Sequence, residues 1–138
     1  MSEKVINEKA LLENIAFLKR KGGFSKFCAV VKAGAYGHCV ENIVPLLKGK
    51  VDYFAVATFR EALEVKKLDN DAKILVLSPE VEKKIKDGIE LTVARVGDVL
   101  ALEKLRKRVF VHLKINTGMN RLKMMLRRLF HWAEHHLS

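Results

Sequence analysis

The hydrophobic and polar positions of this 138-residue chain form short apolar runs separated by longer amphipathic stretches. Apolar runs without polar alternation are typical of strands in a sheet that is covered on both faces. The stretches between them have apolar residues every three or four positions, as in helices. The predicted strands are 27–31, 53–57, 73–77, 91–94 and 109–113. The predicted helices are 9–21, 39–48, 59–68, a short lysine-rich helix that ends at Gly88, and 98–106.

Local signals support two of these helices and complicate a third. Gly22 and Gly23 follow the first helical stripe and are expected to end it. Thr58 and Glu61 have the Thr-x-x-Glu spacing of a capping box and predict a helix start. Pro45 lies inside the stretch 39–48, so we expect that helix to kink or to start late.

Five apolar strands that alternate with helices predict parallel pairing and right-handed crossovers. The sequence has no Gly-x-Gly-x-x-Gly or phosphate-loop motif, which argues against dinucleotide or nucleoside-triphosphate binding. The alternation alone favours a piece of a (β/α)₈ barrel only weakly over a doubly wound sheet. A whole barrel needs roughly 250 residues, so the predicted fold is an α/β, partial TIM barrel.

Composition fits a globular chain, with 49% hydrophobic and 30% charged residues. We see no signal peptide and no apolar run of membrane-spanning length, and therefore expect a cytoplasmic protein. The net charge of +10 is compatible with nucleic acid, an anionic membrane or phosphorylated ligands. Because the basic residues are spread along the chain without interleaved aromatics, we expect solvated helix faces rather than a nucleic-acid partner.

The two cysteines, Cys28 and Cys39, fit no metal-ligand spacing. Free thiols are expected for them, with a disulfide as the minor alternative.

The stretch 29–38, Ala-Val-Val-Lys-Ala-Gly-Ala-Tyr-Gly-His, is the first candidate for chemistry. Its lysine, Lys32, ends an apolar run, and ligands of parallel α/β folds collect at the carboxyl ends of strands. A neutral lysine amine attacks aldehydes to form a Schiff base. A strand-end lysine that simply reaches solvent is the plainer alternative.

The stretch 112–122, His-Leu-Lys-Ile-Asn-Thr-Gly-Met-Asn-Arg-Leu, is the second candidate. It again follows an apolar strand and turns at a glycine. Together the two stretches resemble alanine racemases, in which a strand ends in Val-Lys-Ala before Ala-Tyr-Gly-His. The same family has His-Leu-Lys-x-Asp-Thr-Gly-Met-x-Arg-Leu downstream. The resemblance covers about residues 5–122 and implies a truncated N-terminal barrel domain that binds pyridoxal 5′-phosphate.

The resemblance also implies an activity, the interconversion of L-alanine and D-alanine by a homodimer, as a step toward peptidoglycan precursors. Lys32 would form the Schiff base with the cofactor and act as one of two bases, and Tyr36 would hydrogen-bond the cofactor phosphate. Arg121 would lie near the phenolic oxygen of the cofactor and the substrate carboxylate. Lys114 stands where some members have a carbamylated lysine, and Val30 and Leu77 where the family has apolar pocket walls.

Three positions depart from the family pattern: Gly34 replaces an Asp or Asn, Cys39 a glycine and Asn116 an aspartate. The family's opposite-face tyrosine, from the C-terminal domain of the partner subunit, and its arginine against the pyridine nitrogen have no counterpart in the sequence. We therefore expect little or no racemase activity from the isolated chain. The alternatives are a non-catalytic cofactor-binding protein, similar to the single-domain pyridoxal-phosphate homeostasis proteins, and a basic interaction scaffold.

After residue 122 the resemblance stops, which divides the chain into a barrel-type domain, 1–122, and a tail, 123–138. The tail has the pattern of a basic amphipathic helix. Three interpretations stay open: a cover for an exposed sheet edge, an end without a role, or a surface for a membrane or a partner helix. His131 and His135 are one helical turn apart, but no third ligand is evident, so no metal site is predicted.

Overall fold

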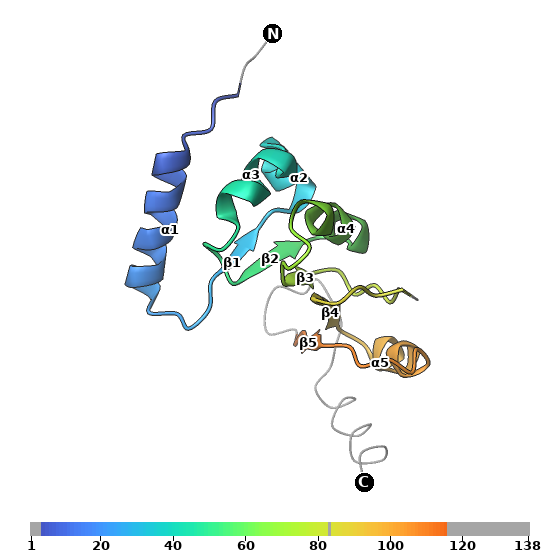
Figure 1. Cartoon of the computed structure of the whole chain (residues 1–138). Helices are drawn as coiled ribbons and strands as arrows, with labels where there is room; N and C mark the ends of the chain where they lie inside the picture. Colours follow the sequence, from blue (N-terminus) through green and yellow to red (C-terminus); the bar gives the residue numbers. More distant parts are fainter. Residues whose placement is uncertain (1–3, 83, 116–138) are drawn as a thin grey trace.

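Five parallel strands form the centre of the computed structural model, which describes residues 4–82 and 84–115. Arg121 and the tail lie outside the described residues. The strands pair in the order in which they occur along the chain (Figure 1). They are β1 (Cys28–Val30), β2 (Tyr53–Val56), β3 (Ile74–Val76), β4 (Ile89–Val93) and β5 (Val111–Leu113). The prediction of five parallel strands at these places is confirmed.

The described residues form five helices, four of them in stretches where the apolar periodicity predicts a helix and one in the stretch after Val31 that the sequence predicts as a turn. They are α1 (Glu8–Gly22), α2 (Lys32–Gly37), α3 (Val40–Leu47), α4 (Phe59–Leu68) and α5 (Val96–Glu103). Gly23 ends α1 with a left-handed φ of 59°, which glycine adopts without strain. The capping box of Thr58 and Glu61 is present at the start of α4. Pro45 lies inside α3, which begins at Val40.

One predicted helix is wrong. The lysine-rich segment before Gly88 contains no helix over the described residues 79–82 and 84–88. Its sequence has too few apolar positions to bury a helical face, and so short a helix is marginal without that burial. Ile85 is buried and attaches the segment to the core, while most of its charged neighbours stay exposed.

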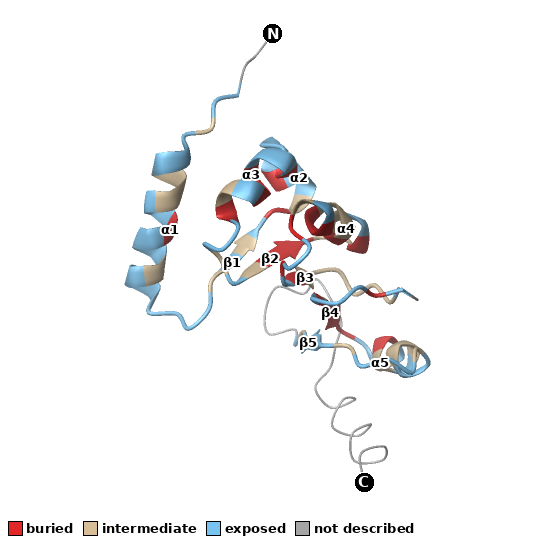
Figure 2. Cartoon of the chain, viewed as in Figure 1, coloured by how far each residue is buried: buried red, intermediate tan, exposed pale blue. Residues whose placement is uncertain are grey.

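The core lies between one face of the sheet and the helices α3 and α4 (Figure 2). Val56, Val76 and Leu91 are register partners on neighbouring strands, and all three are fully buried. Ala62 and Val65 of α4 are also fully buried, and α4 packs against β2, β3 and α3. We call this side of the sheet the helix-side face.

The opposite side of the sheet, which we call the open face, is more polar and less covered. Its register partners are Val30, Ala55, Leu75 and Glu90, one from each of four neighbouring strands. Val30 is 44% exposed, although it lies in a strand, whereas Ala55 is buried. The helix α1 lies beside β1 at one end of the sheet, where it buries Ile15, while most of its surface is exposed (Figures 1 and 2).

Candidate active site

The candidate site begins where β1 ends. The N–H of Val31 donates to the carbonyl of Ala55 at 2.8 Å, which extends the pairing of β1 and β2 by one residue. Val31 is buried on the helix side, and Lys32 follows it at the carboxyl edge of the sheet with a half-buried side chain. The Lys32 ammonium lies 5.9 Å from the centre of the Tyr36 ring, within the range of a cation–π contact. The structure therefore brings together the lysine and the tyrosine of the first motif.

The turn that links these two residues is left-handed. Ala33, Gly34, Ala35 and Tyr36 all have φ between 52° and 60°. Such angles cost glycine nothing, but they cost other residues about 1–2 kcal/mol each. The sequence predicts a turn here without its handedness, because Ala-rich sequences normally prefer right-handed φ. Surrounding contacts must therefore stabilise this turn.

Several contacts supply that stabilisation. The N–H of Ala35 donates to the carbonyl of Val31 at 2.9 Å, and the Ala35 side chain is buried. The Nδ1 atom of His38 lies 3.0 Å from the carbonyl oxygen of Ala35. At the start of the turn, the N–H of Ala33 donates to Oε1 of Glu61 on α4 at 2.8 Å.

Cys39, where the resemblance implies a glycine, has a φ of 67° and a ψ of 116°. This positive φ costs glycine less than a residue with a Cβ, so Cys39 is strained there. Cys28 and Cys39 are both free thiols in the structure. Partial burial raises the pKa of the Cys28 thiol, so it stays protonated at neutral pH.

Two other site residues named from the sequence, Leu77 and Lys114, lie at the same edge of the sheet as Lys32. Leu77 follows β3 and donates its N–H to the carbonyl of Val56 at 2.9 Å. Lys114 follows β5 and donates its N–H to the carbonyl of Val93, also at 2.9 Å. Because the strands are parallel, Leu77 and Lys114 share the carboxyl edge with Lys32. Tyr36 is 61% exposed, so its side chain is accessible to a ligand at this edge.

A polar cluster on the open face was not anticipated from the sequence. The Tyr53 hydroxyl donates to Oε1 of Glu90 at 2.9 Å, and Nε2 of His112 lies 2.6 Å from Oε2 of the same carboxylate. The hydrogen bond to Glu90 and partial burial raise the pKa of Tyr53 above its ordinary value. The ammonium groups of Lys26 and Lys73 lie 5.6 and 5.9 Å from the centre of the Tyr53 ring. His112 is the first residue of the second motif, and the structure pairs it with Glu90.

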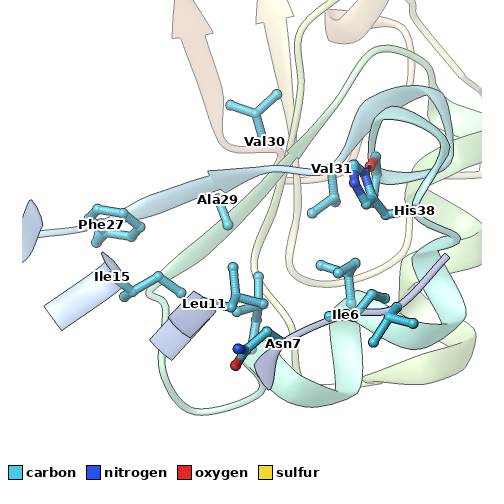
Figure 3. A pocket seen from close by; sticks show the side chains of 13 residues that line it. Ile6, Asn7, Leu11, Ile15, Phe27, Ala29, Val30, Val31 and His38 are labelled. Atoms are coloured by element: carbon cyan, nitrogen blue, oxygen red, sulfur yellow. Dashed lines mark hydrogen bonds between the residues drawn. The ribbon is translucent and has the colours of Figure 1, made fainter. Parts of the chain in front are cut away.

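A separate cavity of about 400 Å³ lies on the helix side of β1, between that strand and α1. Figure 3 shows Ala29 and Val31 pointing toward Leu11 and Ile6, while Val30 points to the other side of the strand. The lining is mainly apolar and does not include Lys32. The cavity reaches Val31, Ala35 and His38 at the end of β1 and in the turn that follows, on the side away from Lys32.

Within the described residues, no group of three or more histidine, cysteine or acidic side chains is arranged to hold a metal ion. Across the same part of the chain, no helix is long and apolar enough to cross a membrane.

A parallel sheet of βα units with a lysine at its carboxyl edge defines the class: an α/β barrel-type domain with its candidate site where such folds bind ligands. The family model described as alanine racemase, N-terminal domain, matches residues 6–125. The chain belongs to this family, and its fold is a partial barrel of that type.

Individual relatives agree with the family match. The alanine racemase of Francisella tularensis subsp. tularensis is 36% identical in an alignment of 124 positions, which covers 85% of this chain and 34% of that protein. The crystal structure of the biosynthetic alanine racemase from Pseudomonas aeruginosa is 28% identical, with a TM-score of 0.77 over 94% of this chain and 38% of that one. The alanine racemase from Corynebacterium glutamicum is 32% identical, with a TM-score of 0.74 over 85% of this chain and 36% of that one. The chain thus spans about a third of the length of the curated relatives it matches.

Proposed function

We propose that this chain forms the pyridoxal-phosphate-binding part of an alanine racemase, with Lys32 as the residue that bonds the cofactor covalently. The observation that carries the proposal is the position of Lys32. Its half-buried side chain leaves the carboxyl end of β1 beside the Tyr36 ring, in a family defined by racemases. An amine at this edge meets the place where parallel α/β folds collect their ligands.

The residues of the edge fit the polar and apolar parts of such a cofactor. Tyr36 offers an exposed hydroxyl for the phosphate, and Val30 and Leu77 offer apolar surface for the ring. Lys114 lies at the same edge, where a carbamate on its amine would accept a hydrogen bond from Arg121. Arg121, outside the described residues, would bind the substrate carboxylate through its planar guanidinium.

Pyridoxal phosphate, when bound, withdraws electrons from the α-carbon of an attached amino acid. The contribution of this chain would be to remove a proton from that carbon, or return it, at the Nζ atom of Lys32. Racemisation needs a second base on the other side of the same carbon. We assign no residue at the carboxyl edge, among those that the structure describes, to that role. We therefore expect cofactor binding from the isolated chain, with little or no turnover of alanine.

The test is covalent modification of Lys32 by millimolar pyridoxal 5′-phosphate. Wild-type chain is expected to gain a visible absorbance band and, after borohydride reduction, a cofactor adduct on the peptide that contains Lys32. Lys32→Ala should lose both signals. The matched control is Lys9→Ala, which removes a lysine whose side chain is 87% exposed and should change neither signal. If the wild-type chain shows no preference for Lys32 over Lys9, the cofactor proposal is wrong.

A racemase assay on the same samples separates two roles. Modification of Lys32 without any interconversion of L- and D-alanine would favour a non-catalytic cofactor-binding protein. Modification with turnover would favour a complete racemase site.

We also propose that the chain works in a homodimer. In the described sheet, β1 and β5 each have one neighbouring strand, which leaves backbone groups on both edges open to pairing. Val111 and Leu113 of β5 are more than 40% exposed, which adds apolar surface at one of these edges. Size-exclusion chromatography with light scattering should give twice the mass of the chain, and a monomer at micromolar concentration would contradict the proposal.

A further inference from the structure

We propose that Glu61 is a positioning residue for Lys32: its carboxylate fixes the left-handed turn that sets the direction of the lysine side chain. This inference rests on the proposed function, because it gives Glu61 a role in the chemistry of Lys32. Glu61 itself lies on α4, 29 positions further along the chain, and the sequence marks it only as part of a capping box.

The Glu61 carboxylate accepts hydrogen bonds from two separate segments of backbone. Its Oε2 atom accepts from the N–H groups of Ala57 and Thr58, at 2.7 and 3.1 Å, in the loop after β2. Its Oε1 atom accepts from the N–H of Ala33, at 2.8 Å, in the turn after β1. The half-buried Glu61 side chain therefore connects, through hydrogen bonds, the turn after β1 with the loop after β2.

The capping box does not need the bond to Ala33. A capping box consists of the Thr58 hydroxyl accepting from the Glu61 N–H, at 3.3 Å, and of the Glu61 carboxylate accepting from the Thr58 N–H. Oε2 alone satisfies the second half. The other oxygen remains for the turn after β1, so helix capping and the tie to Ala33 are separable functions of the same residue.

The turn needs such a tie because its backbone is strained. Ala33, Ala35 and Tyr36 are non-glycine residues with positive φ, a conformation that persists only where the surroundings stabilise it. The bond from Ala33 is made to an ionised acceptor, and such bonds are shorter and stronger than bonds between neutral groups. Ala33 directly follows Lys32, so the first peptide group beyond the lysine is held in one orientation.

The experiment compares Glu61→Ala with Thr58→Ala, which removes the other half of the capping box and leaves the acceptor of Ala33 in place. A third variant, Glu64→Ala, removes a carboxylate from the same helix that pairs with Arg60 across 3.6 Å. If Glu61→Ala does not fold, Glu61→Gln replaces it, because a single amide oxygen cannot serve both loops.

The first measurement needs no cofactor. The amide of Ala33 should exchange its hydrogen about tenfold faster or more in the Glu61 variant, as expected for losing a bond to a charged group. In Thr58→Ala and Glu64→Ala its exchange should stay within about twofold of wild type.

The second measurement is the rate at which pyridoxal 5′-phosphate modifies Lys32, relative to Lys9 in the same chain. This ratio should fall about tenfold in the Glu61 variant and stay near wild type in the two controls. Equal effects of Glu61→Ala and Thr58→Ala on both measurements would reduce Glu61 to a helix cap and overturn the proposal. If wild-type Lys32 is not modified preferentially, the proposed function fails, while the exchange of Ala33 still decides whether Glu61 holds the turn.

Discussion

The two faces of the sheet differ in what they bury and in what they leave accessible. On the helix-side face, Val56, Val76 and Leu91 form a row of fully buried side chains across three strands. On the open face, the partners at the neighbouring register are Ala55, Leu75 and Glu90, and Glu90 carries hydrogen bonds to Tyr53 and His112. The same strands thus supply an apolar core on one side and a polar surface on the other.

This difference separates stability from chemistry along single strands. Because successive side chains of a strand point to opposite faces, a substitution at one position acts on the core and at the next on the open face. The candidate site lies at the carboxyl edge, where both faces end and the chain crosses from the sheet to the helices. Substitutions in the three regions should therefore have effects that differ in size and kind.

The largest effect is expected from Leu91→Ala on the helix-side face. Leu91 is fully buried, and its truncation leaves a cavity in a close-packed core, so the free energy of unfolding should fall by about 3 kcal/mol. Leu75→Ala is the matched control, because it removes the same atoms from a half-buried position on the open face. Urea unfolding followed by circular dichroism measures both. Equal losses would contradict the distinction between the faces.

A gain in stability is expected at the edge between the faces, from Cys39→Gly. The φ of 67° at this position strains any residue with a Cβ, and glycine lowers that strain by more than its own larger loss of chain entropy, so the free energy of unfolding should rise by about 1 kcal/mol. Cys39→Ala removes the thiol but keeps the Cβ, and should leave stability close to that of wild type. A gain from alanine as large as that from glycine would mean that the thiol, not the backbone, is unfavourable.

The smallest effect is expected on the open face, from Tyr53→Phe. Loss of the hydrogen bond to Glu90 should lower the free energy of unfolding by about 0.5 kcal/mol at pH 7, because the group is partly solvated. The effect should also depend on pH. The pKa of Tyr53 in the folded chain is raised above 10.0, so its contribution is complete below pH 10 and is lost as the pH rises through the folded value.

Urea midpoints measured between about pH 8 and pH 11, a range that includes the ordinary tyrosine pKa of about 10, test this dependence. The wild-type midpoint should fall more steeply above pH 10 than that of Tyr53→Phe. Parallel curves for the two proteins would show that the Tyr53 hydroxyl does not couple folding to alkaline pH.

Much of the fold could be predicted from sequence because its signals are local. Strands such as β2 are apolar runs, and α4 begins at a Thr-x-x-Glu motif whose capping box forms as expected. The lysine-rich segment before Gly88 is not a helix, because it has too few apolar residues to bury a helical face against the core. Lys66 shows a similar limit: its helix pattern predicts a solvated lysine, yet it is 5% exposed and donates to the carbonyl of Asn70 at 2.8 Å. Burial lowers the pKa of this ammonium.

The candidate site was predictable only in part, for a different reason. Lys32 and Tyr36 are neighbours in sequence, so a motif can identify them. Glu61 and Glu90 act across strands, and no local pattern tells which backbone or hydroxyl group a distant carboxylate will reach. The Thr-x-x-Glu motif predicts the contact of Glu61 with Thr58. It does not predict the contact of Glu61 with Ala33, which is distant in sequence.

The strands lie in the sheet in the same order as along the chain, which has a consequence for how the protein folds during synthesis. Each pairing joins segments only 15 to 25 residues apart, from Cys28 with Tyr53 to Ile74 with Ile89. A ribosome releases residues from the amino terminus onward, so every new strand emerges when its template is already present. The sheet can therefore grow by one unit at a time during synthesis, without waiting for a distant partner, and its short loops keep the entropy of each closure small.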